Sequence, residues 1–216
     1  MPKLHLYSVQ DTPEDHAGNL ELMRLIAKPK PHIAWIPSDF RSGSHWFHAK
    51  VAYYARYDAV LEETVRFDVN STAADLERLW TFDAIHLSGG NTVEFLRSLR
   101  QHQMLEPLRM FVQKGGVLIG VSAGAILMTP SIETTFVGES GDLRAETGFD
   151  QAALGLVDFA FVPHYSDDLE TTCRELASTL RQTVYACRDG DGIVVNEGVV
   201  RLVGAVLQFN PALNGA

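Results

Sequence analysis

The sequence predicts an α/β fold of three layers, in which helices cover both faces of a largely parallel sheet. Short apolar segments alternate with amphipathic segments from the start of the chain, the pattern of strands joined by helices. Two of the apolar segments lead directly into glycine-rich turns. A chain of 216 residues fits one domain of this class, and without a repeat or linker we place no boundary within 1–216.

The expected elements follow in order along the chain. Strands are predicted at 4–9 and 32–37, with a helix at 13–27 between them, and further strands at 84–87 and 117–121. Lys114-Gly115-Gly116 ends the helix that precedes the last of these. Later strands are expected at 158–162, 183–186, 192–195 and 199–203, and Asn196-Glu197-Gly198 is a hairpin turn.

Composition excludes several classes of function. The formal charge of −9 and the absence of a basic cluster argue against nucleic-acid binding. The sequence has neither a signal-peptide pattern nor an apolar run long enough for a membrane span, and only two cysteines, so we expect a reduced, cytoplasmic protein. His45 and His48 lack a third ligand nearby, so we predict no metal. The sequence leaves the oligomeric state open, and a homo-oligomer is compatible with it.

The strongest chemical signal is Gly120-Val121-Ser122-Ala123-Gly124, which matches the G-x-S-x-G nucleophile elbow. An apolar strand precedes it and an alanine-rich, helix-compatible segment follows. A sharp strand-to-helix turn exposes the central serine, and larger neighbours would collide with it. The alternative is an ordinary serine in a glycine-rich turn.

A second glycine-rich turn, Ser88-Gly89-Gly90-Asn91-Thr92, follows the strand at 84–87. Both turns are expected at the carboxyl edge of the sheet, where open α/β sheets bind ligands. The backbone N–H groups of Gly90 and Ala123 would form an oxyanion hole. We also expect Asn91 to contact substrate. A phosphate-binding turn is the alternative, although no G-x-G-x-x-G or Walker pattern is present.

A serine nucleophile needs a base and an acid. His164 directly follows the strand at 158–162, whereas His5, His32 and His86 lie inside strands and are expected to pack or to line an edge. Asp189 and Asp191 flank Gly190 in a turn after another strand. Spacing alone leaves open which of them would orient His164, or whether the segment is a plain Asp-Gly turn.

Six motifs together resemble peptidase E, the aspartyl dipeptidase family to which cyanophycinases are related. They are Ser-Gly-Gly-Asn-Thr at 88–92, Gly-x-Ser-Ala-Gly-Ala at 120–125, Ser-Ile-Glu-Thr-Thr at 131–135, Gly-Phe-Asp at 148–150, Pro-His-Tyr at 163–165 and Asp-Gly-x-Gly-Ile at 189–193. The resemblance implies a fold similar to class I glutamine amidotransferases, with Ser122 as nucleophile, His164 as base and the Gly90 and Ala123 amides as oxyanion hole. It also selects Asp189 as the acid.

The chain departs from that family at two places. The family's acid is commonly Glu, one methylene longer than Asp189. After Thr134-Thr135, aspartyl dipeptidases continue Asn-Asp-x-Pro, whereas this chain continues Phe136-Val137-Gly138-Glu139. The second departure argues against selectivity for an amino-terminal Asp, although Arg144 and Arg188 are available to recognise a carboxylate.

The sequence therefore predicts a serine peptidase that hydrolyses short peptides without a cofactor. Two alternatives remain. An α/β-hydrolase esterase would use the same elbow with the order Ser, acid, His, which Asp142, Asp150 or Asp158 would formally allow. A non-catalytic, amidotransferase-like binding domain would leave Ser122 idle.

Overall fold

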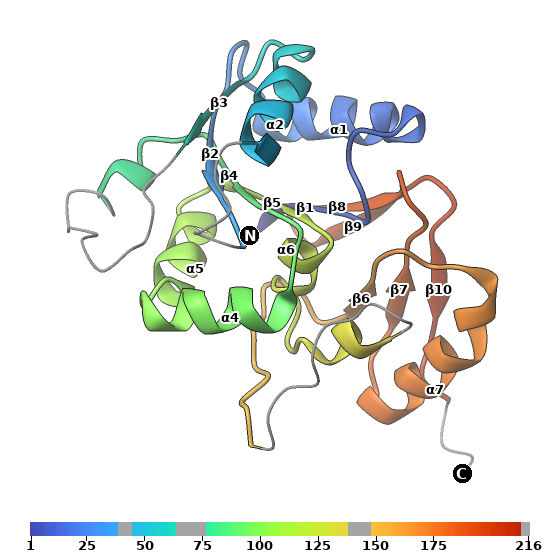
Figure 1. Ribbon diagram of the computed structural model, residues 1–216. Coiled ribbons are helices and arrows are strands. Elements are labelled where there is room, and N and C mark those ends of the chain that lie inside the picture. Colours follow the sequence, from blue (N-terminus) through green and yellow to red (C-terminus); the bar gives the residue numbers. More distant parts are fainter. Residues whose placement is uncertain (39–44, 64–76, 138–147, 213–216) are drawn as a thin grey trace.

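The computed structural model describes residues 1–38, 45–63, 77–137 and 148–212, and it contains two sheets (Figure 1). The large sheet has seven strands in the order β3-β2-β4-β5-β1-β8-β9, and the small sheet has three in the order β10-β7-β6. The strands of the large sheet are β1 (Lys3–Tyr7), β2 (His32–Ile36), β3 (Val60–Glu63), β4 (Ala84–Leu87), β5 (Val117–Val121), β8 (Gly192–Asn196) and β9 (Val199–Val203). Those of the small sheet are β6 (Ala160–Val162), β7 (Val184–Ala186) and β10 (Leu207–Phe209).

Helices pack on both faces of the large sheet, as the sequence predicts. The α-helices are α1 (His16–Ile26), α2 (His45–Ala55), α4 (Thr92–Gln101), α5 (Leu105–Gln113), α6 (Ala123–Ile126) and α7 (Glu170–Leu180). The 3-10 turns are η1 (Pro13–Asp15), η2 (Glu133–Phe136) and η3 (Asp167–Leu169). Helices α1 and α2 share one buried cluster with the sheet, whereas α4, α5 and α6 share another on the opposite face. Helix α7 covers the small sheet.

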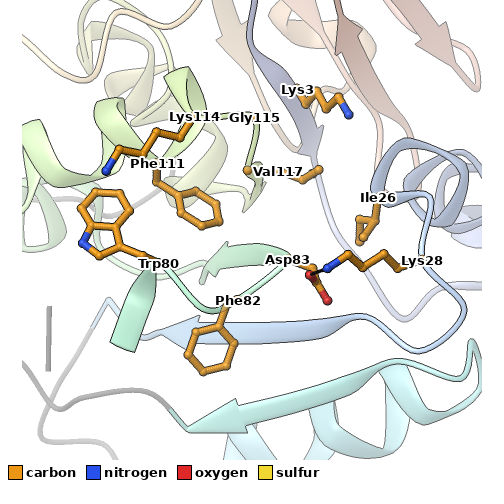
Figure 2. Close-up of a pocket in the computed structure, with 11 residues that line it drawn as sticks. Lys3, Ile26, Lys28, Trp80, Phe82, Asp83, Phe111, Lys114, Gly115 and Val117 are labelled. Carbon is orange, nitrogen blue, oxygen red and sulfur yellow. Dashed lines mark hydrogen bonds and ion pairs between the residues drawn. The ribbon is translucent and has the colours of Figure 1, made fainter. Parts of the chain in front are cut away.

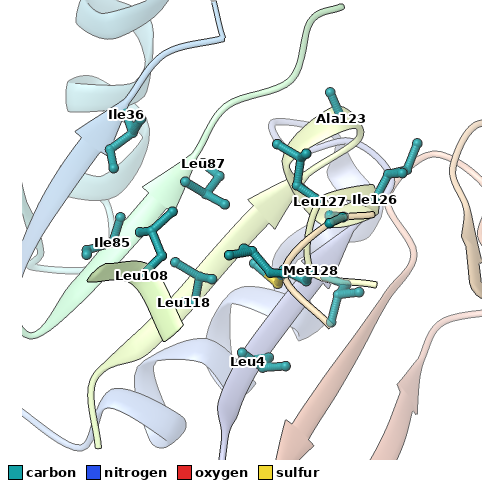
Figure 3. Close-up of a cluster of buried hydrophobic side chains, with 14 of the residues drawn as sticks. Leu4, Ile36, Ile85, Leu87, Leu108, Leu118, Ala123, Ile126, Leu127 and Met128 are labelled. Atoms are coloured by element: carbon teal, nitrogen blue, oxygen red, sulfur yellow. The ribbon is translucent and has the colours of Figure 1, made fainter. Parts of the chain in front are cut away.

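The central strands are mostly apolar, since helices cover both faces of the sheet, and the two histidines within them, His5 and His86, are fully buried. In β5, Leu118 belongs to the buried cluster that also contains Leu108 and Ile126, and Figure 3 shows side chains of this cluster. The next residue, Ile119, faces the cluster beneath α1 and α2. This alternation is what a strand with a period of two requires when helices lie on both sides.

Strand directions determine which turns meet at the edge where the site forms. Strands β1 to β5 are parallel, so the turns after β1, β4 and β5 lie at one edge of the sheet. Strand β8 runs antiparallel to β1, and it therefore begins at that same edge. The turn before β8, which contains Asp189, is thus brought beside the turn after β5, which contains Ser122.

The structure differs from the sequence-based expectation in several elements. The helix predicted at 13–27 divides into η1 and α1, and α1 ends where Ala27 adopts a left-handed φ of 57°. The strand predicted at 158–162 is shorter, and β6, β7 and β10 form a separate sheet that the sequence pattern did not distinguish. The hairpin turn at 196–198 is confirmed, because Asn196 pairs with Val199.

Candidate active site

Ser122 lies in a strained turn between β5 and α6. Its φ of 49° and ψ of −109° are rare for a residue with a side chain, and its N–H donates to the carbonyl of Tyr7 at 2.9 Å. The flanking glycines are required by sterics. A Cβ at Gly120 would lie 2.5 Å from the carbonyl carbon of Gly124, and one at Gly124 would lie 2.3 Å from the Leu87 oxygen. The turn therefore has the geometry expected of a nucleophile elbow.

Three side chains from separate segments form a row of hydrogen bonds at this turn. The Ser122 Oγ atom lies 2.9 Å from Nε2 of His164, and Nδ1 of His164 lies 2.9 Å from Oδ1 of Asp189. His164 follows β6 with a positive φ of 55°, and Asp189 lies between β7 and β8. Because a carboxylate only accepts, Nδ1 of His164 carries the proton and Nε2 is free to accept one from the serine.

Asp191 contacts other partners. Its Oδ2 accepts from the N–H of Arg188 at 3.2 Å, and its Oδ1 accepts from the N–H of Ala205 at 3.0 Å. The side chain is buried, and a Cβ at Gly204 would lie 1.8 Å from Oδ1. Asp191 thus shapes the turn, while Asp189 is the carboxylate in contact with His164.

The second glycine-rich turn is fixed against the elbow by its backbone. The N–H of Gly124 donates to the carbonyl of Ser88 at 3.1 Å. Ser38 donates from its Oγ to the carbonyl of Gly89 at 2.7 Å, and a Cβ at Gly90 would lie 2.1 Å from that Oγ. Gly90 has a φ of 135°, which an L side chain rarely adopts. Ala123 is the first residue of α6, so its N–H has no partner within the helix.

Two of the predicted substrate-binding residues, Asn91 and Arg188, have partners within the protein. Asn91 caps α4, where its Oδ1 accepts from the N–H of Glu94 at 2.8 Å. Arg188 pairs with Asp167, and its guanidinium lies 5.2 Å from the ring centroid of Tyr165, next to His164 in the chain. Arg144 lies outside the described residues.

Ser8, which the sequence did not identify, forms hydrogen bonds with two residues of this row. It follows β1, its side chain is fully buried, and its Oγ accepts from the N–H of His164 at 2.8 Å. The same oxygen donates to Oδ1 of Asp189 at 3.2 Å. The available signal was its position, since Ser8, like Ser88 and Ser122, directly follows a central parallel strand.

Two further histidines and both cysteines are buried. His5 and His86 are fully buried, and burial lowers the pKa of His5 to about 3. Burial raises the pKa of the Cys173 thiol to about 11, and burial with the nearby Asp191 charge raises that of Cys187. Both thiols are thus poor nucleophiles at neutral pH, and Cys173 packs in the buried cluster between α7 and the small sheet.

Within the described residues, no group of three or more His, Cys, Asp or Glu side chains is arranged to hold a metal ion. Within the same ranges, no helix has the length and apolar character of a membrane span. The side chain of His45 lies outside the described set.

A separate cavity of about 240 Å³ lies at the opposite edge of the large sheet (Figure 2). It is lined at the start of β1 and β5 by Lys3 and Val117, and by Lys28, which pairs with Asp83. The cavity is therefore remote from the turn that contains Ser122, which follows the other end of β5.

Comparison with known proteins identifies the family of this chain. The model of peptidase family S51 matches residues 7–203. Peptidase E of Salmonella arizonae is 33% identical over 146 residues, which cover 63% of this chain and 62% of that protein. The chain thus spans less than two thirds of that relative. An uncharacterized peptidase of Pasteurella multocida is 31% identical over 77% of this chain and 79% of its own length.

Solved structures share the fold. A Listeria monocytogenes protein provisionally named as a peptidase E superposes with a TM-score of 0.73 at 20% identity, covering 94% of this chain and 98% of that one. A peptidase from an acI-B1 Actinobacterium gives a TM-score of 0.60 at 13% identity, covering 99% and 96%. At these identities the superpositions establish the fold alone. The family model spans most of the chain, and the chain therefore belongs to peptidase family S51.

Proposed function

We propose that this protein is a serine peptidase that hydrolyses short peptides through an acyl-enzyme at Ser122. The observation that carries the proposal is the hydrogen-bonded row from Ser122 through His164 to Asp189, which starts at a strained strand-to-helix turn. A serine, an imidazole and a carboxylate in this order are the parts that acyl transfer needs. Membership of peptidase family S51 supports a peptide as the substrate.

The first half-reaction forms the acyl-enzyme. Nε2 of His164 takes the Ser122 proton as Oγ attacks the peptide carbonyl carbon, and the carbonyl oxygen becomes an anion. The N–H groups of Gly90 and Ala123 would stabilise that anion, each such donor contributing about 10²–10³ in turnover. Collapse of the tetrahedral intermediate breaks the C–N bond, and His164 returns its proton to the leaving amine.

The second half-reaction repeats the chemistry with water. His164 takes a proton from water, whose oxygen attacks the acyl carbon, and the proton then returns to Oγ of Ser122 as the acid product leaves. Asp189 takes no proton in this scheme. Its carboxylate holds the imidazole in one tautomer and stabilises the imidazolium that forms in each half-reaction.

The segment after Thr135 is the best candidate for the substrate side-chain pocket. The hydroxyl of Thr135 donates to that of Thr92 at 2.8 Å, which attaches η2 to the start of α4, beside the turn that contains Gly90. Phe136, the apolar residue of η2, packs against the same core cluster as α4, so the border is apolar at this residue. An apolar border disfavours a buried Asp side chain, and we therefore propose weak selectivity for amino-terminal Asp.

The α/β-hydrolase alternative requires an acid that precedes the histidine in the chain. Asp150 instead pairs with Arg100 at 2.8 Å on the surface, and Asp142 lies outside the described residues. His164 already has Asp189, which follows it in the chain, as its carboxylate partner. The order Ser, His, Asp therefore favours the peptidase proposal over an esterase of that fold.

A fluorophosphonate probe tests the proposal and separates it from a non-catalytic binding domain. We expect the purified protein to label stoichiometrically at Ser122, since the probe reacts only with an activated serine. Ser122→Ala should abolish labelling, whereas Ser131→Ala, at a serine whose Oγ accepts from the N–H of Glu133, should label normally. A folded wild-type protein that does not label, and that cleaves no peptide in a dipeptide panel, would overturn the proposal.

A further inference from the structure

Ser8 connects the turn that carries Asp189 to the segment that carries His164. Its own N–H donates to the carbonyl of Asp191 at 3.1 Å, so its backbone holds the turn that carries the acid. Its Oγ accepts from the N–H of His164 at 2.8 Å and donates to Oδ1 of Asp189 at 3.2 Å. One buried serine thus binds the backbone of the proposed base and the side chain of the proposed acid.

This link matters because the row is assembled from two sheets. Ser122 follows a strand of the large sheet, whereas His164 follows β6 of the small sheet, and Asp189 lies on the connection between the sheets. Ser8 follows β1, whose last residue, Tyr7, accepts the hydrogen bond from the N–H of Ser122. Ser8 is therefore fixed to the same backbone as the nucleophile and reaches across to the other two residues.

His164 also needs such support for a conformational reason. Its φ of 55° lies in the left-handed region, which costs free energy for a residue with a side chain and persists only when surrounding contacts hold it. The Ser8 hydroxyl supplies one contact through the His164 N–H. The neighbouring N–H, that of Tyr165, donates to the carbonyl of Cys187 at 3.0 Å.

We propose that Ser8 is a positioning residue that fixes the base and the acid relative to the nucleophile. This inference rests on the proposed function, since it assigns Ser8 a role in aligning that row. Ser8 is 0% exposed, so it acts through His164 and Asp189 and makes no contact with substrate. The Ser8 hydroxyl donates its proton to Asp189 and accepts from the His164 N–H through a lone pair. Both bonds form together in one orientation of the Asp189 carboxylate.

The main test is the rate of fluorophosphonate labelling in Ser8→Ala. We expect labelling to reach the same final extent but to slow by about 10–100-fold, because misplacing the base by about 1 Å costs this much. With a dipeptide substrate, kcat should fall and KM should stay near its wild-type value. Thr129→Val is the matched control, because Thr129 is also a fully buried hydroxyl but bonds to the carbonyls of Ile126 and Ser131.

Two further measurements separate positioning from general stability. The Nδ1 proton of His164 should be visible by NMR in the wild type and should broaden or shift in Ser8→Ala, while Thr129→Val retains it. Combining Ser8→Ala with Asp189→Asn should cost less than the product of the single effects, because both act on one alignment. If Ser8→Ala fails to fold, Ser8→Cys retains the volume with a weak donor and should show the same slowing.

The outcomes distinguish this inference from the proposal beneath it. Wild-type protein that labels, together with Ser8→Ala or Ser8→Cys labelling at the wild-type rate, would overturn the role of Ser8 and leave the peptidase proposal intact. A decline in labelling that Thr129→Val reproduces would also overturn it, since any lost buried hydroxyl would then suffice. Folded wild-type protein that neither labels nor cleaves any dipeptide of the panel would overturn both proposals.

Discussion

The carboxylates of Asp189 and Asp191 are separated by one glycine and bind different partners. Asp189 contacts the imidazole of His164 at 2.9 Å, whereas Asp191 accepts from the backbone N–H groups of Arg188 and Ala205. Gly190 has a φ of 89°, and a Cβ there would lie 2.6 Å from that of Glu14, so only glycine fits between them. The turn thus directs one acid to the site and uses the other to hold its own backbone.

This division predicts opposite effects for two similar substitutions. Asp189→Asn should lower kcat by about 10⁴-fold, because the amide no longer fixes the productive tautomer of His164. Asp191→Asn should leave kcat within about tenfold but lower the melting temperature, since a buried carboxylate with two donors is lost. Steady-state kinetics and thermal melts of the two variants test this. The reverse ranking in kcat would transfer the acid to Asp191.

Strain at the proposed nucleophile predicts a difference between two inactive variants. Ser122→Ala and Ser122→Gly should both lose nearly all peptidase activity, a loss of about 10⁴–10⁶-fold. Ser122→Gly should be the more stable by about 1 kcal/mol, because glycine adopts this positive φ without strain. Denaturant unfolding measures the difference. Wild-type turnover in either variant would contradict the role of Ser122, and equal stabilities would contradict the strain.

The thiols are expected to be dispensable for catalysis. Cys173 and Cys187 are both fully buried with raised pKa values, so neither provides a thiolate at neutral pH. A Cys173→Ala, Cys187→Ala double variant should lose about 1 kcal/mol per site through weakened packing and retain kcat per labelled serine. Active-site titration with the fluorophosphonate normalises the comparison. Strong loss of turnover in folded, fully titrated protein would instead indicate a cysteine mechanism.

Buried His5 should make stability fall in acid. Burial holds its pKa at about 3, against an ordinary value of 6.5, so between these values the unfolded chain binds a proton that the folded chain excludes. Stability therefore decreases as the pH falls below about 6.5. His5→Phe retains the stacking on Tyr7, whose ring centroid lies 3.8 Å away, and removes the titration. The melting temperature of His5→Phe should fall less than that of wild type between pH 7 and pH 4.5. An equal fall in the two proteins would refute the contribution of His5.

Substrate selectivity gives the last prediction. The apolar border at Phe136 should give Asp-Leu no large advantage over Ala-Leu, Gly-Leu or Met-Leu, with kcat/KM values within about tenfold of one another. Measuring the four dipeptides under one condition tests this. A preference for Asp-Leu of about a hundredfold, roughly 3 kcal/mol, would show that another group neutralises the carboxylate. Arg188 would then be the first residue to replace, with Arg174→Gln, at an exposed arginine of α7 that pairs with Glu170, as control.

The helix and sheet layers and the two glycine-rich turns could be predicted from local sequence. Buried parallel strands need apolar residues on both faces, and sharp turns need glycine, so both requirements are visible in local sequence. The motif around Ser122 and the strand before it were therefore recognisable from adjacent residues. The position of His164 after an apolar strand was informative for the same reason.

Local spacing left the acid open between Asp189 and Asp191, and the family resemblance selected Asp189. The contact between Asp189 and His164, and the contacts of Ser8, come from the folded structure. Asp189 and Asp191 have the same local sequence context, and the choice depends on the antiparallel direction of β8 and on the N–H groups that Arg188 and Ala205 present. Ser8 reaches residues more than 150 positions away, with His164 at a separation of 156. Contacts between segments so distant depend on how two sheets pack together, and no local pattern of residues encodes that arrangement.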